Sequence, residues 1–512
     1  MKKIFLTLTA TIFLFAANGQ GLYDALRYSD YGIGGTARYM SMAGSFGALG
    51  GDASAALDNP AALGIFRSSE ISLSLSLTPT SSYAAWKGEN SRANATYFGI
   101  NNLSWVFNIP TNSESGYLAS NLSFGYQKIK NFNRKTYIKS GVQQSVSLSN
   151  FIADYTEDLS ESALQNNDAY GDDNIGWLSI LGYDAGLISP YIDPEHPEEN
   201  LWQSNLGARE RVIPYYASEE RGGIDEYNFS YSGNFNDKFY IGAGLSLQSF
   251  SYSWKSTYYE DFANGGSLSL ENLFVSSGIG INLKAGAIVR PAKFLRLGIS
   301  FVSPTYCTMT ENLPQAKMQS AFEPSVTAKT PENYRYSYSF QTPLRVQASV
   351  GLVFGKISAI NVDYQFSNQK SAHFSGQSNK DFLLENKDIK NFAKNVHAIK
   401  AGIEFRLGNY VKLRGGFAYA TAPVKENAPK ILPYNSIRTD MEFFAFKQSI
   451  YGSAGIGFYL GKNINLDLAY VYNANYQEFM PFYYADKEIK KALKSEIKTV
   501  KNNIVATFAI RY

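Results

Sequence analysis

The segment Ile71-Ser72-Leu73-Ser74-Leu75-Ser76-Leu77 decides the fold class, because apolar and hydroxyl side chains alternate strictly along it. Successive side chains of a β-strand point to opposite faces, so the segment predicts a strand with one apolar face and one polar face. The same alternation recurs as far as the C-terminus, for example at 464–472 and 504–512. Its repetition along most of the chain predicts an all-β protein.

The alternating segments have the length that a transmembrane barrel requires. About 14 of them reach barrel-spanning length, for which roughly 9–11 tilted residues suffice. An even number of strands brings both ends of a barrel to the same side of the membrane. The predicted strands lie at 69–78, 94–109, 116–130, 224–235, 239–254, 275–290, 294–303, 342–354, 358–367, 395–407, 411–421, 447–460, 464–475 and 500–512.

The connections between these strands alternate between short and long. Membrane barrels have short periplasmic turns and longer outer loops, whereas a secreted β-sandwich has no reason to separate the two kinds. We therefore predict that residues 68–512 form a 14-stranded antiparallel transmembrane β-barrel. The short connections are 110–115, 236–238, 291–293, 355–357, 408–410 and 461–463, and the long ones are 79–93, 131–223, 255–274, 304–341, 368–394, 422–446 and 476–499.

Composition agrees with a membrane barrel. Aromatic residues make up 15% of the chain, with 37 Tyr and 34 Phe, and charged residues only 18%. Barrels collect aromatic side chains in two interfacial girdles. Residues 1–19 carry Lys2 and Lys3, an apolar stretch and the small residues Ala17 and Gly19, which predicts a cleaved secretory signal peptide. We expect the mature chain in the bacterial outer membrane, in contact with its lipid.

The longest connection, 131–223, is too long for a bare loop. Its apolar groups predict a folded extracellular insertion with short helices. A further helix is predicted at 486–500, where Lys and Glu recur at i, i+4 spacings.

The strand faces opposite the apolar ones are polar and are expected to line a wet lumen. The hairpin register places Glu404 opposite Arg414, which predicts a lumenal ion pair that stiffens the wall.

Residues 20–67 do not alternate and are rich in glycine and other small residues. This composition suits a compact plug inside the barrel. A phosphate-binding loop is disfavoured because no Gly-Lys-Ser/Thr follows. Tyr39, Met40, Met42 and Phe46 are candidate ligand contacts that offer an adaptable apolar surface, although packing of the plug against the wall would use the same residue types equally well.

Nothing in the sequence predicts enzyme chemistry. The chain has three histidines, and no spacing brings a nucleophile to a base, so we predict no catalytic residues and no enzyme. The acidic surroundings of His196 are typical of solvated charge rather than of a metal site. The single cysteine, Cys307, excludes an internal disulfide, and we expect no metal and no cofactor. A net charge of +3 without a basic cluster gives no sign of a nucleic-acid partner.

The stretch from Gly47 to Gly64 resembles the hatch signature of the FadL and TodX family of outer-membrane transporters, and Asn59-Pro60-Ala61 matches that family's Asn-Pro-Ala motif. Segments 397–405 and 413–419 also resemble the family's late strand pair. The resemblance implies a monomeric barrel with an N-terminal hatch (20–67) inside the lumen and a gate at Asn59, Pro60 and Ala61. It also implies passive uptake of small hydrophobic molecules such as long-chain fatty acids or aromatic hydrocarbons. The alternative function is a surface-exposed structural or adhesin-type barrel without transport.

Overall fold

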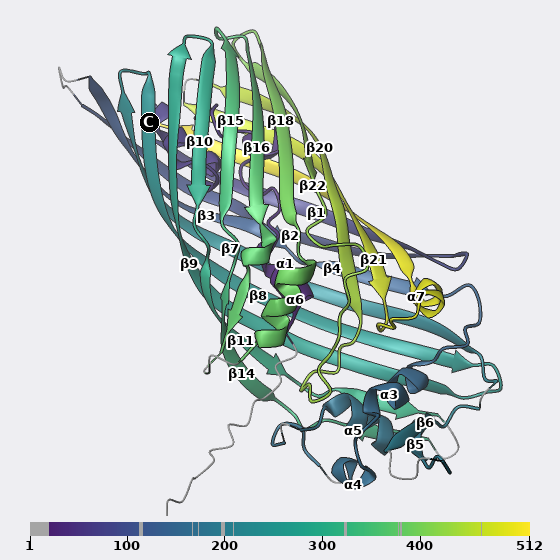
Figure 1. Cartoon of the computed structure of the whole chain (residues 1–512). Coiled ribbons are helices and arrows are strands. Elements are labelled where there is room, and N and C mark those ends of the chain that lie inside the picture. Colours follow the sequence, from purple (N-terminus) through teal and green to yellow (C-terminus); the bar gives the residue numbers. More distant parts are fainter. Residues whose placement is uncertain are drawn as a thin grey trace, which may run out of the picture.

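The computed structural model describes residues 20–111, 116–165, 167–172, 174–195, 200–207, 209–321, 325–376, 378, 381–461 and 463–512. The predicted signal peptide (1–19) and His196 lie outside the described residues. Figure 1 shows a tilted barrel of long strands, with short turns at one end and helices gathered at the other. We call these the short-turn end and the loop end.

The wall has 14 antiparallel strand positions and closes where the last strand pairs with the first, which confirms the predicted fold class. In order around the barrel the strands are β1 (Glu70–Trp86), β2 (Glu89–Pro110), β3 (Tyr117–Asn131), β7 (Val212–Phe235), β8 (Phe239–Phe262), β9 (Ser267–Ala292), β10 (Leu295–Val302), β15 (Arg345–Phe354), β16 (Ser358–Asn368), β18 (Asn395–Leu407), β19 (Val411–Ala420), β20 (Phe443–Leu460), β21 (Ile464–Met480) and β22 (Ser495–Arg511).

Shorter strands lengthen the wall at the loop end. They are β4 (Arg134–Lys139), which pairs with β7; β11 (Tyr306–Leu313) and β12 (Lys317–Ser320), which pair with β9; β13 (Val326–Lys329), which pairs with β12; β14 (Tyr334–Gln341), which pairs with β11; and β17 (His373–Ser375), which pairs with β14.

The apolar phase of the strands faces outward. On β9, Ile279 and Leu283 are 72% and 60% exposed, whereas Asn282 and Lys284 are almost fully buried. A closed barrel leaves no strand edge unpaired, and an apolar outer surface can be stable only against acyl chains. The protein is therefore a transmembrane barrel of the outer-membrane type.

Several connections predicted to be long loops are continuations of the wall. β1 and β2 run on to a tight hairpin at Lys87-Gly88, both with positive φ, so the predicted loop 79–93 is wrong. The predicted loop 255–274 is likewise part of β8 and β9. On β8 the apolar phase inverts: Leu247 points outward, but Phe250 and Trp254 point inward. The strands leave the membrane here. Their outward side chains no longer need to be apolar, so the alternation of apolar and polar residues is lost.

The remaining elements of the loop end are small. The helix predicted at 486–500 is correct only in its first half, because α7 (Lys487–Leu493) ends where β22 begins. Within 131–223 the wall continues through β4 and β7, and the helices lie between them. The other elements are α3 (Leu148–Thr156), α4 (Glu161–Leu164), α5 (Trp177–Asp184), β5 (Ile188–Tyr191), β6 (Leu201–Ser204), η3 (Gln369–Ser371) and α6 (Leu383–Phe392).

Residues 20–67, which we call the N-terminal segment, lie within the barrel and pack on inward-facing side chains of the wall (Figure 1). The segment forms α1 (Leu22–Ser29), α2 (Ala37–Ser41) and the short 3₁₀ helices η1 (Ala53–Leu57) and η2 (Pro60–Ile65). Side chains cap three of these four helices, and Asn59 caps η2. Thr36 caps α2 and Asp52 caps η1.

Candidate functional site

The Asn59-Pro60-Ala61 tripeptide begins η2 and fits closely against the wall. The Asn59 side chain accepts a hydrogen bond from the Ala61 amide (3.0 Å) and donates one to the Gly47 carbonyl (2.7 Å), so it ties two turns of the segment together. Proline suits the first helical position because its missing N–H would have no partner there. On the wall, a Cβ at Gly286 would lie 1.9 Å from Asn59 Oδ1, and one at Gly242 would lie 2.5 Å from Pro60. Only glycine lets the segment approach this closely.

Glu404 joins the wall to the N-terminal segment. Arg414 Nε donates to Glu404 Oε2 at 2.7 Å, as expected for residues opposite each other in the β18–β19 hairpin. Arg38 of α2 also donates to Glu404, at 3.0 Å, and Arg414 reaches Asp467 on β21. The carboxylate therefore does more than stiffen the hairpin, because it anchors α2 as well.

Other polar side chains of the wall are likewise used by the segment. Asp363 accepts hydrogen bonds from the Phe46 and Gly47 amides (3.0 and 3.2 Å), and Asn361 contacts the Ser45 hydroxyl at 3.0 Å. Lys400 pairs with Asp58 at 2.9 Å. The inward strand faces are polar, as expected, and in this part of the lumen the N-terminal segment supplies their hydrogen-bonding partners.

Two cavities remain beside the segment. The Lys501 cavity has a volume of about 150 Å³ and the Arg345 cavity about 140 Å³. Both are lined by Asp30, Gly32, Ile33 and Gly34, so the stretch 30–34 is the partition between them. We call this stretch the partition.

The cavity linings are mixed rather than apolar. Aromatic side chains and hydroxyl, amide and charged groups line the Lys501 cavity together, and the Arg345 cavity is similar. A molecule with an apolar body and a polar group would find partners for both among these side chains. The Lys501 cavity is lined by, among others, Tyr23, Phe132, Tyr252, Trp254, Phe443, Phe444, Tyr451, Thr78, Asn101, Asn473, Gln477, Lys130, Arg134, Glu220 and Lys501.

The four predicted ligand contacts divide into two groups. Met40 lines the Lys501 cavity and Tyr39 lines the Arg345 cavity. Met42 and Phe46 line neither: Met42 packs against Gly402 of the wall, and Phe46 lies beside the Tyr39 ring, with centroids 5.6 Å apart. All four side chains are buried.

The partition lies along an irregular stretch of β3. The Gly32 amide donates to the Ile129 carbonyl at 3.0 Å, and Gly34 approaches the Lys128 carbonyl so closely that a Cβ would lie 2.1 Å from it. The pairing of β3 with β7 shifts register between Lys128 and Lys130. The partition is therefore bonded to the wall where the wall's own ladder is disturbed.

At the loop end, α1 is held by a buried cluster of charges that we call the Arg438 cluster (Asp24, Arg27, Glu311, Lys430, Arg438 and Asp440). Arg438 reaches Asp24 at 3.2 Å and Glu311 at 3.7 Å, and it forms two hydrogen bonds with Asp440. Burial opposes ionisation of Asp24, but Arg438 and Arg27 hold its pKa below the ordinary value. Burial likewise opposes ionisation of Asp440, yet Arg438 and Lys430 lower its pKa to about 2.

No pattern in the sequence predicts this cluster. Its members come from α1, from β11 and from the segment between β19 and β20, and the last two lie in stretches that were predicted to be loops. Charged residues in a loop carry no information about a distant partner.

Neither a sequence-family model nor a curated protein matches the chain. Solved structures do match. The TodX monoaromatic hydrocarbon channel in its deltaS2 form is 12% identical over 97% of this chain and 100% of its own, with a TM-score of 0.50. The deltaS2S3 form is 11% identical over 94% and 99%, also with a TM-score of 0.50. The chain has the fold of the TodX channel. A FadL homologue of Pseudomonas aeruginosa is 12% identical over 96% and 99%, with a TM-score of 0.49.

This likeness agrees with the sequence resemblance at the level of the fold. None of the described helices is long and apolar enough to cross a membrane. No group of His, Cys, Asp and Glu among the described residues is arranged to hold a metal ion.

Proposed function

We propose that the protein is a passive outer-membrane channel for small hydrophobic molecules, and that its N-terminal segment is the hatch. The observation that carries the proposal is the partition, because Asp30, Gly32, Ile33 and Gly34 are the residues of the segment that line both cavities. A molecule bound in one cavity could pass to the other if this short stretch moved. Long-chain fatty acids and aromatic hydrocarbons are the proposed cargo, and the solved channels of this fold include the toluene transporter TodX of P. putida.

The contacts of the partition suit a movable element. Its hydrogen bonds to β3 involve one backbone pair at Gly32 and the Gln127 side chain at Gly34, and an ion pair joins Asp30 to Lys130. By contrast, the stretch from Ala37 to Gly64 is fixed to the wall on many sides. We propose that the gate motif at Asn59, Pro60 and Ala61 supports the hatch, while the partition opens beside the register shift of β3.

A reversible cross-link tests this function. Asp30 of the partition and Lys130 of β3 are in side-chain contact, so Asp30→Cys with Lys130→Cys is expected to join the partition to the wall under oxidation. Uptake of labelled oleate or toluene into liposomes that contain the purified barrel should stop when the bond forms and return after reduction. The two single-cysteine variants are the controls. Equal uptake by the locked and reduced forms would remove the hatch from the mechanism, and no uptake by any form would favour the structural or adhesin-type barrel.

A further inference from the structure

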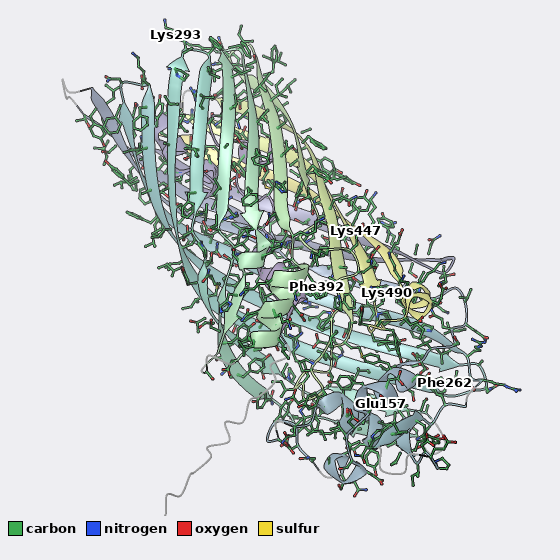
Figure 2. All side chains as sticks on the ribbon, viewed as in Figure 1. Glu157, Phe262, Lys293, Phe392, Lys447 and Lys490 are labelled. Atoms are coloured by element: carbon green, nitrogen blue, oxygen red, sulfur yellow. The ribbon has the colours of Figure 1, made fainter. Side chains whose placement is uncertain are left out.

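The short-turn end of the barrel carries a basic rim. Lys293 lies at the extreme of this end, opposite the helices of the loop end (Figure 2). Among the described residues of the turns and strand ends here, the acidic ones are Asp237 and Glu70, which pair with Arg67 and Arg511. The basic residues of the rim are Arg67, Lys238, Arg290, Lys293, Lys356, Arg406 and Arg511.

Among the described residues, no acidic side chain pairs with the remaining rim cations. Lys238, Lys293 and Lys356 are exposed and have no carboxylate within ion-pair distance in the described part of the chain. Arg290 and Arg406 donate to backbone carbonyls of their own turns. At the loop end, Lys447 and Lys494 both pair with Glu478, whereas Lys87 and Lys487 have no carboxylate within ion-pair distance among the described residues.

Each of these turns also presents an outward apolar side chain beside its cation. Lys238 precedes Phe239, Lys293 precedes Phe294 and Lys356 precedes Ile357, and all three apolar side chains are exposed. Their rings and methyl groups face the acyl chains at the edge of the bilayer. The neighbouring ammonium groups are then at the depth of the lipid headgroups, which a flexible lysine stem readily reaches.

We propose that this rim is a binding collar for anionic phospholipids of the leaflet around the short-turn end, with Lys238, Lys293 and Lys356 contacting the lipid phosphates. An unpaired cation next to a lipid-facing apolar group fits the two parts of a phospholipid, whereas an acidic soluble protein would have no use for the apolar neighbours. Anionic headgroups attract basic side chains held at the membrane surface. The collar does not depend on what the channel carries.

The test compares two triple variants in mixed nanodiscs of phosphatidylglycerol and phosphatidylcholine. The rim variant carries Lys238→Gln, Lys293→Gln and Lys356→Gln. The matched control carries Lys87→Gln, Lys135→Gln and Lys487→Gln, which remove the same charge from the loop end. Native mass spectrometry of the released barrels counts the lipids that each one retains.

We expect the rim variant to retain several-fold less phosphatidylglycerol than the wild type, with phosphatidylcholine unchanged and the control like the wild type. Equal retention by the rim variant, an equal loss in the control, or equal retention of both lipids by the wild type would each overturn the collar. The cross-link of Asp30 and Lys130 reports on transport alone, so the two proposals fail separately.

Discussion

The N-terminal segment is held in two different ways at the two ends of the barrel. Near the short-turn end it is fitted sterically, with Asn59 and Pro60 against wall glycines at 286 and 242, and Arg38 also pairs there with Glu404. Near the loop end, α1 is held by the Arg438 cluster, whose charges are almost fully buried. A steric fit requires no charge to lose its hydration, and it permits a single placement of the segment. Buried charges have lost their hydration, and they regain it when water enters. The two kinds of contact are therefore expected to respond to different changes: the steric fit to added side-chain volume, and the buried charges to the loss of a charge.

The largest effect is expected from Arg438→Leu. The change leaves Asp24, Glu311 and Asp440 without their shared cation in a buried site, and breaking a buried ion pair from one side costs about 3–5 kcal/mol. Urea unfolding in detergent measures the free energy of unfolding. Arg335→Leu, at an exposed position of β14, is the control and should change it by less than about 0.5 kcal/mol. Similar losses in both variants would show that the cluster does not hold this end.

The second prediction concerns pH and Glu442, which lies just before β20. Burial and the neighbouring Asp440 raise the pKa of Glu442 to about 7, from an ordinary value of 4.5. The folded protein therefore holds a proton that the unfolded chain has already lost. Stability from this group is complete below pH 4.5 and falls as the pH rises to 7, by about 3 kcal/mol in all.

Glu442→Gln should remove that loss of stability. The free energy of unfolding of the variant should therefore increase relative to that of the wild type as the pH rises from 4.5 to 7. The measurement is the free energy of unfolding across this range. The raised pKa would be contradicted by parallel curves for the two proteins. Asp440, with its lowered pKa, acts in the opposite sense and only at lower pH, so the two windows are separate.

The same two ends show what sequence could predict. The strands could be predicted because every second residue faces the lipid and must be apolar. That rule holds from the short turns to the membrane boundary. Beyond it, the outward residues of β1 are Pro79, Ser81, Tyr83 and Ala85, and the inward ones are no more polar, so the alternation disappears although the strand continues. On β8 the apolar phase even reverses.

The site divides in the same way. Glu404 and Arg414 are ten residues apart in a hairpin, so register alone places them opposite each other. Arg38 is 366 residues from Glu404, and no local sequence pattern predicts their contact. The cavities and the partition could not be predicted from the sequence either, because they depend on how the N-terminal segment folds inside the closed wall.

The third prediction tests the steric end. Gly286→Ala places a methyl group 1.9 Å from Asn59 Oδ1, and such overpacking costs about 1–3 kcal/mol because a side chain or the backbone must shift. Gly452→Ala is the control, since a Cβ there meets nothing within 4 Å. Urea unfolding and limited proteolysis of the N-terminal segment should both respond to the first change only. A response of equal size in both variants would mean that the close approach at Gly286 is not selective.

The smallest effect is expected from Asn59→Ala, which removes the cap of η2 and the bond to Gly47. Loss of such a cap costs about 1 kcal/mol. A more specific measurement is the coupling energy between Asn59→Ala and Gly286→Ala. Alanine at position 59 has no amide group for the new methyl to meet, so Gly286→Ala should cost less in the Asn59→Ala background than in the wild type. A double-mutant cycle gives this difference directly, because the two residues are in contact. Additive losses would show that the wall glycine serves some neighbour other than Asn59, and the steric account of the short-turn end would fail with it.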